Sequence, residues 1–219
     1  MTMLIPDAEH DDLVLGERPL IVCDIDEVVL EFVTPFQAFL TANGHELRPT
    51  SFRLNGNVFS LAHGGETPAD EVARLLEAFF TGQDAWQTPV LAAADSLARL
   101  SEEADIVFLT AMPPRHHAVR RQLLTLHGFD YPMIATEAAK GPAVLALHGS
   151  RDHPVVFIDD IFVNLQSVRQ HVPQTLLLNL IANDIFRGLA PHPGEGVTIA
   201  TDWSHAEELI RAHFAAEAR

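Results

Sequence analysis

The sequence predicts an α/β fold in which a parallel, Rossmann-like sheet is flanked by helices. Short and almost wholly apolar runs recur along the chain, and segments with apolar residues at helical spacing separate them. Such runs are typical of strands buried on both faces, and their alternation with helices predicts parallel pairing. The alternation is interrupted once, after the first run, which predicts an insertion at that point.

Each element follows from its local pattern. Strands are predicted for the apolar runs Leu20–Cys23, Ile106–Leu109, Met133–Thr136, Val155–Ile158 and Thr175–Leu180, of which 133–136 is the weakest. Helical spacing predicts helices over 89–104, 115–127, 141–148, 162–171 and 203–216. The first two helices place on one face, respectively, Leu91, Ala94, Leu97 and Leu100, and Val119, Leu123 and Leu126. Gly128 is placed to end the second helix, and the Pro- and Gly-rich stretch 188–201 is predicted to be irregular surface.

Residues 32–88 are predicted to form a small, mostly helical cap inserted into a core of residues 1–31 and 89–219. Two helical segments, 35–42 and 67–80, flank a middle with Asn-Gly and Gly-Gly turn signals at positions 43–44, 55–57 and 63–65. No strand of the main sheet is predicted there. The alternative is one long crossover with a decorated loop, which its length disfavours.

The composition of the chain disfavours some classes of binding partner. The formal charge of -16 over 219 residues argues against a nucleic acid polymer, whose phosphates need a basic surface. A small phosphorylated substrate stays possible, because a divalent cation can invert the local field. No apolar run reaches the roughly 18 residues of a membrane span. The acidic first residues and the single cysteine lead us to expect a cytoplasmic protein, whereas the oligomeric state has no sequence signal.

Polar residues follow the predicted strands where these end. Asp24 and Asp26 come directly after the first strand, Thr110 after the second, and Asp159-Asp160 after the fourth. Carboxyl ends of parallel strands meet at one edge of a sheet, where ligands bind. Clustered carboxylates repel one another unless a cation intervenes, and Mg²⁺ prefers such oxygen ligands.

Lys140 lies after the weak strand and is the only lysine beside thirteen arginines. A compact ammonium is not interchangeable with the planar head of arginine. A cation at the start of a helix also opposes the helix dipole unless an anion compensates. These points favour a site lysine over a solvated surface charge. The other candidate residues also have structural alternatives to a site role. Asp24 and Asp26 could form a turn or a helix cap after the strand. Asp159 and Asp160 could cap the next helix, a role that is compatible with a place in the site.

Four segments, in this order, resemble the motifs of the haloacid dehalogenase-like superfamily. They read IVCDIDEVV, IVFLTAMP, AAKGPA and VVFIDDIFVN, and they span the core from residue 20 to about 180. Any one of these motifs alone is weak evidence for the resemblance, but all four in this order are strong evidence. The insertion 32–88 resembles the C1-type cap of that superfamily, which closes over the substrate.

The resemblance implies catalytic roles. Asp24 would be the nucleophile that forms an aspartyl-phosphate, and Asp26 would protonate the leaving oxygen and later activate water. Thr110 and the neighbouring backbone N–H of Ala111 would hold phosphoryl oxygens. Lys140 would neutralise charge on the nucleophile and the phosphoryl group.

The resemblance also implies a Mg²⁺ site formed by the carboxylates of Asp24 and Asp159 and the backbone carbonyl of Asp26. Asp160 would act through water or by orienting Lys140. The implied activity is hydrolysis of a small phosphomonoester, since dehalogenating members lack an acid at the position of Asp26. The alternatives are a phosphotransferase or another hydrolase of this superfamily, including a nucleotidase-like one, or a non-catalytic phospho-ligand-binding member. Phosphonate cleavage would call for a lysine in the cap, which has none.

Overall fold

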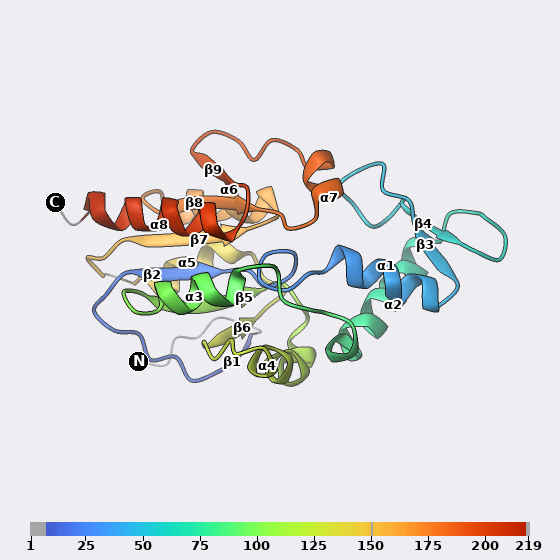
Figure 1. Ribbon diagram of the computed structural model, residues 1–219, viewed down its shortest axis with the longest axis horizontal. Helices are drawn as coiled ribbons and strands as arrows, with labels where there is room; N and C mark the ends of the chain where they lie inside the picture. The colour runs from blue at the N-terminus through green and yellow to red at the C-terminus, as the bar shows by residue number, and fades with distance from the viewer. Residues whose placement is uncertain (1–7, 150, 218–219) are drawn as a thin grey trace.

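The computed structural model describes residues 8–149 and 151–217 and contains a seven-stranded sheet (Figure 1). The strands, in spatial order, are β1 (Glu9–His10), β6 (Met133–Ala135), β5 (Asp105–Thr110), β2 (Leu20–Cys23), β7 (Val155–Asp159), β8 (Leu176–Leu180) and β9 (Val197–Ala200). All neighbours pair in parallel except the edge strand β1, which is antiparallel to β6. The predicted α/β class with a mostly parallel sheet is confirmed.

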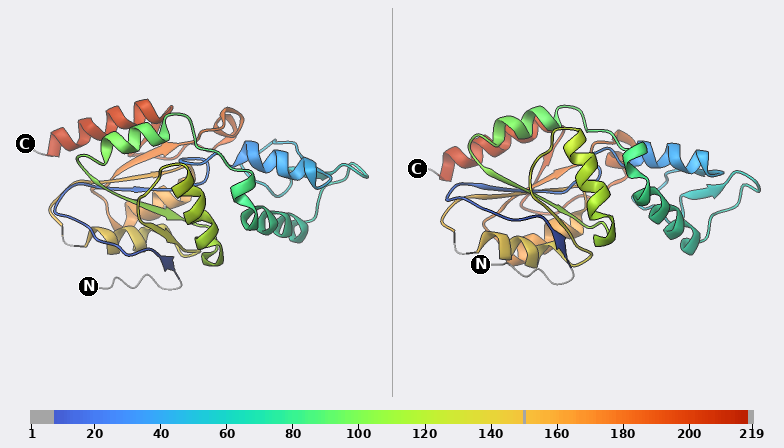
Figure 2. Two further views of the ribbon diagram at one scale, coloured as in Figure 1. Left: turned by 60° about the horizontal axis from the view of Figure 1, so that its bottom comes forward. Right: turned by 90° about the horizontal axis from the view of Figure 1, so that it is seen from below.

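Both faces of the sheet are buried, and the side chains of each strand alternate between them. In β2, Ile21 and Cys23 belong to one core cluster and Leu20 and Val22 to the other. Helices α3 (Ala93–Leu100), α4 (His117–Leu126) and α8 (Trp203–Glu217) cover the first face. Helices α5 (Lys140–His148) and α6 (Phe162–His171) cover the second (Figure 2). This double cover explains why β2 contains no polar residue.

Two elements in the last third of the chain differ from the expectation. The stretch 188–201 was expected to be irregular, yet β9 forms there because Val197, Thr198 and Ile199 are β-branched and pair with β8. Helix α7 (Asp184–Leu189) precedes it, and Asn183 caps its start by accepting hydrogen bonds from two backbone N–H groups.

The expected helices 89–104 and 115–127 are shorter in the structure. Helix α3 starts only at Ala93, because Ala92 has a φ of 64° and Pro89 and Val90 pair with the loop after β2. Leu91 is consequently 89% exposed. The second segment is divided into the 3-10 helix η2 (Pro114–His116) and α4. Leu126 was predicted on the buried face of this helix, but it is 74% exposed, so that part of the prediction is wrong. Gly128 follows α4 with a φ of 79°.

A second group of elements lies beyond the carboxyl ends of the strands (Figure 1). It contains α1 (Val33–Ala42), the hairpin of β3 (His45–Leu47) and β4 (Val58–Ser60), α2 (Ala69–Thr81) and the 3-10 helix η1 (Gln83–Ala85). The two strands form a sheet of their own, and neither joins the main sheet. We call this group, residues 32–88, the cap; its boundaries stay a prediction.

Aromatic side chains form the interior of the cap. Phe36 and Phe79 are fully buried, and their ring centroids lie 5.2 Å apart in an edge-to-face arrangement. Phe52 of the cap packs against Phe186 of α7, with the two ring centroids 5.8 Å apart. In the part of the chain that the structure describes, no helix has the length and apolar character needed to cross a bilayer.

Cys23 supports a simple test of the packing. Its thiol is fully buried at the end of β2, and burial, with the charge of Asp24, raises its pKa well above the ordinary value. Because the thiolate is the reactive form, we expect no reaction of the folded protein with an aromatic disulfide reagent, and full reaction after unfolding in guanidinium. Absorbance of the released thiol measures both. Since this is the only cysteine, fast labelling of the folded protein would contradict the packing at this strand end.

Candidate active site

Three neighbouring strands bring the predicted polar residues to one edge of the sheet. Asp24 follows β2 directly, Thr110 is the last residue of β5, and Asp159 is the last residue of β7. The register continues past β2, because the backbone N–H of Asp24 donates to the carbonyl of Ile158 at 2.9 Å. Asp24, Thr110 and Asp159 are all buried, so their positions are fixed by the sheet.

Lys140, the first residue of α5, connects two of these strand ends. Its Nζ lies 2.7 Å from Asp24 Oδ1 and 2.6 Å from Asp159 Oδ2, and its side chain is 1% exposed. Burial alone would lower the pKa of this lysine, but the charges of Asp159 and Asp24 outweigh it and raise the pKa. The lysine is therefore a permanently charged bridge between two buried carboxylates.

Asp159 and Asp160 have different surroundings. The carboxylate of Asp159 accepts hydrogen bonds from Lys140, from the backbone N–H of Ile161 at 2.8 Å and from Asn164 Nδ2 at 3.0 Å. Asp160 lines a cavity, and among the described residues no hydrogen bond reaches its carboxylate. Asn179 Nδ2 donates to the backbone carbonyls of both residues and fixes the turn. Asp159 thus orients Lys140, and Asp160 offers open oxygens.

The carboxylates of Asp24, Asp159 and Asp160 can hold a divalent cation. Each offers one oxygen, and these three atoms lie within 4.8 Å of one another. Burial, opposed in part by Lys140, raises the pKa of Asp24 to about 7. Burial and the charges of Asp159 and Asp24 raise the pKa of Asp160 well above its ordinary value. A hard cation with oxygen ligands fits this donor set and relieves the repulsion.

The carboxylate of Asp26 is bound by a buried arginine that the sequence reasoning missed. Arg120 of α4 is fully buried, and its Nη1 and Nη2 lie 3.1 and 2.9 Å from Asp26 Oδ2 and Oδ1. Gln87, at the end of the cap, donates to Asp26 Oδ1 at 2.9 Å and accepts from Arg120. Arg120 also contacts Gln83 of η1. The signal in the sequence was an arginine at helical spacing from Leu123 and Leu124, in line with the buried face of α4.

The turn after Asp26 is held by Glu27, whose φ of 63° lies in a region that non-glycine residues rarely adopt. Its buried carboxylate accepts from the backbone N–H groups of Phe32, Val33 and Asn183, at 3.2, 2.7 and 2.6 Å. One side chain thus joins the loop after β2 to the start of α1 and to α7. This fixes the entry into the cap relative to Asp24.

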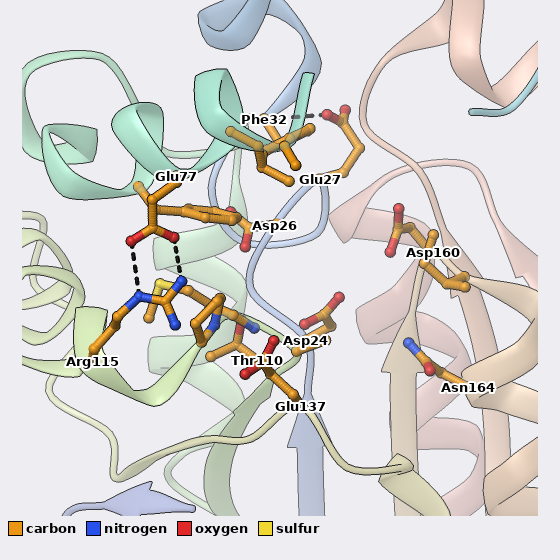
Figure 3. A pocket seen from close by; sticks show the side chains of 17 residues that line it. Asp24, Asp26, Glu27, Phe32, Glu77, Thr110, Arg115, Glu137, Asp160 and Asn164 are labelled. Atoms are coloured by element: carbon orange, nitrogen blue, oxygen red, sulfur yellow. Dashed lines mark hydrogen bonds and ion pairs between the residues drawn. The ribbon is translucent and has the colours of Figure 1, made fainter. Parts of the chain in front are cut away.

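A cavity of about 450 Å³ opens between the strand ends and the cap (Figure 3). Asp24, Thr110, Ala111 and Asp160 line its core end, whereas Phe32 and Glu77 belong to the cap side. Lys140 lies behind Asp24 and does not line the cavity.

An ion-pair cluster joins the cap to the core beside this cavity. Glu77 of α2 accepts from Arg115 Nε at 2.8 Å and lies 3.0 Å from Nε2 of His116, and Arg115 lowers the pKa of Glu77 to about 2 (Figure 3). His116 is buried, and His117 lies 3.4 Å from Asp11. Arg115 and His116 thus connect η2 to the cap, and His117 connects α4 to Asp11.

The structure brings together Asp24, Thr110, Lys140, Asp159 and Asp160, as the motif order predicts. Ala111 lines the same cavity, and Asp26 lies at its wall with its carboxylate on Arg120. The roles assigned to these residues stay predictions. Asn164 of α6 donates a hydrogen bond to the carboxylate of Asp159.

Comparison with solved structures identifies the fold. A haloacid dehalogenase-like family hydrolase from Xanthomonas campestris superposes with a TM-score of 0.58 at 13% identity, over 93% of this chain and 100% of that one. A phosphonoacetaldehyde hydrolase-like protein from Oleispira antarctica gives 0.60 at 11% identity, over 95% and 97% of the two chains. The fold is that of the haloacid dehalogenase-like hydrolases. A hydrolase of this kind from Streptococcus pneumoniae gives 0.56 at 14% identity, over 90% and 99%.

The haloacid dehalogenase-like fold rests on this structural likeness and on the four motifs. No protein-family model matches the sequence, and no curated protein matches it at a significant level. The similarity to the three solved structures extends over almost the whole chain, so the cap as well as the sheet is included in it. The assignment of the cap to the C1 type stays a prediction.

Proposed function

We propose that this chain is a Mg²⁺-dependent phosphatase that hydrolyses small phosphomonoesters through an aspartyl-phosphate on Asp24. The observation that carries the proposal is the bridge of Lys140 between Asp24 and Asp159, within a group of three carboxylates of which Asp24 and Asp160 line the cavity. Phosphoryl transfer requires in-line positioning and cancellation of negative charge. A buried ammonium and a cation site next to one carboxylate supply the cancellation of charge.

In the first step, an oxygen of Asp24 forms a bond to phosphorus, and the bond from phosphorus to the ester oxygen breaks. The leaving oxygen takes a proton from the Asp26 carboxylic acid. In the second step, water attacks the phosphorus of the aspartyl-phosphate and gives its proton to the Asp26 carboxylate, which frees Asp24 and phosphate. Arg120 and Gln87 hold Asp26 at the cavity wall.

The other residues position the phosphoryl group. Thr110 and the backbone of Ala111 lie at the core end of the cavity and would hold phosphoryl oxygens. Lys140 neutralises Asp24 and is itself oriented by Asp159. Asp24, Asp159 and Asp160, with the backbone carbonyl of Asp26, would hold Mg²⁺, which when bound supplies positive charge against the phosphoryl oxygens.

Phosphonate cleavage is the less favoured reaction. It would use a free lysine amine in the cap, and the sole lysine of this chain is buried in the core between two carboxylates. The likeness to a phosphonoacetaldehyde hydrolase-like protein therefore supports a shared fold rather than a shared reaction.

Removal of the metal tests the proposal. We expect release of p-nitrophenol from p-nitrophenyl phosphate with Mg²⁺, and none with excess EDTA. We also expect Mg²⁺ to raise the thermal midpoint of the wild type, because a ligand that binds only the folded state stabilises it. Asp160→Asn should reduce this rise, whereas Asp70→Asn, with a side chain 78% exposed on α2, should not. Full turnover in EDTA would exclude the metal-dependent mechanism.

A further inference from the structure

The wall of the cavity away from the phosphoryl end is apolar. It is formed by side chains of the cap and of the loop after β5, namely Phe32, Ala73, Leu76, Phe80, Met112 and Pro113. Five of these side chains carry no hydrogen-bonding atom. The thioether of Met112 is a weak acceptor and already lies 3.5 Å from Nε2 of Gln83.

The polar groups along the same wall are bound within the protein. Glu77 is paired with Arg115 and His116, and Glu27 accepts three backbone N–H groups. Asp26 is held by Arg120 and Gln87, and the proposed reaction uses it at the leaving oxygen rather than at the carbon skeleton of the substrate.

The other charged lining residues belong to the phosphoryl end of the cavity: Asp24, Asp160 and, beside them, Glu137. Glu137 follows Thr136, whose backbone N–H donates to the carbonyl of Thr110 at 3.0 Å, and it is exposed.

The hydroxyl groups of a sugar would therefore lose water against the apolar side chains of the cap wall. The polar side chains nearest to them, Glu77 and Arg115, are 41% and 59% exposed but already paired with each other.

We infer that the substrates are phosphomonoesters of small apolar alcohols or phenols, whose carbon skeleton fills the space between Phe80, Leu76 and Met112. This inference rests on the proposed phosphatase function and names its substrate class. The cavity volume of about 450 Å³ suits a phosphoryl group with one ring or a short branched chain. Burial of that skeleton against the cap supplies the binding free energy.

A matched pair of probes tests the inference. Cyclohexylmethyl phosphate and glucose 6-phosphate both carry a six-membered ring on a primary phosphate, and they differ in the ring oxygen and hydroxyl groups. We expect kcat/KM to be at least about 10-fold higher for cyclohexylmethyl phosphate. An equal or higher value for glucose 6-phosphate would overturn the apolar assignment. Absence of phosphate release from both probes and from p-nitrophenyl phosphate would instead refute the phosphatase function.

Variants locate the preference in the cap wall. Leu76→Asn keeps the size of a half-buried side chain and adds polar atoms, so the ratio of the two kcat/KM values should fall about 10-fold. Ala73→Ser, at an exposed position, makes a smaller change in the same direction without a risk to folding. Leu61→Asn alters a leucine that is 51% exposed and does not line the cavity, and its ratio should equal that of the wild type. An unchanged ratio in both wall variants would contradict the inference.

Discussion

Replacement of Asp24 by Asn is expected to lower kcat for p-nitrophenyl phosphate by about 10³-fold or more, because the amide cannot form the covalent phosphoryl intermediate. The residue follows β2 directly and lies 2.7 Å from Lys140. Initial rates with saturating Mg²⁺ measure the effect. Phosphate bound covalently to the peptide that contains residue 24, trapped by acid quench of the wild type, would identify the nucleophile directly.

The control for Asp24→Asn is Asp70→Asn, the same chemical change on the exposed surface of α2. Its kcat should equal that of the wild type. Circular dichroism of both variants shows whether the fold is kept. Comparable turnover by Asp24→Asn and wild type would remove Asp24 from the role of nucleophile.

Replacement of Arg120 by Met is expected to lower the free energy of unfolding by about 3 kcal/mol, since it leaves Asp26 with an unpaired charge. The value lies at the low end for a buried pair because the side chain of Asp26 is still 20% exposed. We also expect kcat to fall by about 10²-fold, the usual contribution of one proton-transfer group, because Asp26 loses its orientation. Urea denaturation and initial rates measure the two effects.

A double-mutant cycle separates the ion pair from packing. In the background of Asp26→Asn, removal of Arg120 should cost less in both stability and kcat than in the wild type, because the two residues contact each other. Arg74→Met serves as control, since Arg74 is 72% exposed on α2 and should change the free energy of unfolding by less than about 1 kcal/mol. Additive losses in the cycle would show that Arg120 does not act through Asp26.

The strand ends were predictable from the sequence because each buried strand is a local pattern that stops at a polar residue. The short strand β9 and the hairpin of β3 and β4 were not, since these strands are only partly buried and contain no continuous apolar run. Arg120 was not predictable either. It is separated from Asp26 by 94 positions, and its charge on a buried helix face has a meaning only once the fold places the two together.

The different environments of Asp159 and Asp160 were also beyond the sequence. Two adjacent aspartates cannot be distinguished by residue type. Which of them faces Lys140 depends on the direction in which β7 ends. In the same way, the apolar wall of the cavity combines residues of the cap with Met112 and Pro113 from the core. No local pattern connects these segments.

The burial of Lys140 has a practical consequence for handling the protein. Because it is the only lysine and 1% exposed, the folded chain presents no lysine amine to crosslinkers, acylating dyes or lysine-specific proteases. Cleavage after residue 140 therefore requires α5 to detach from the sheet. The rate of that cleavage, followed by mass spectrometry with and without Mg²⁺, would report the opening of this one region against a background free of other cuts.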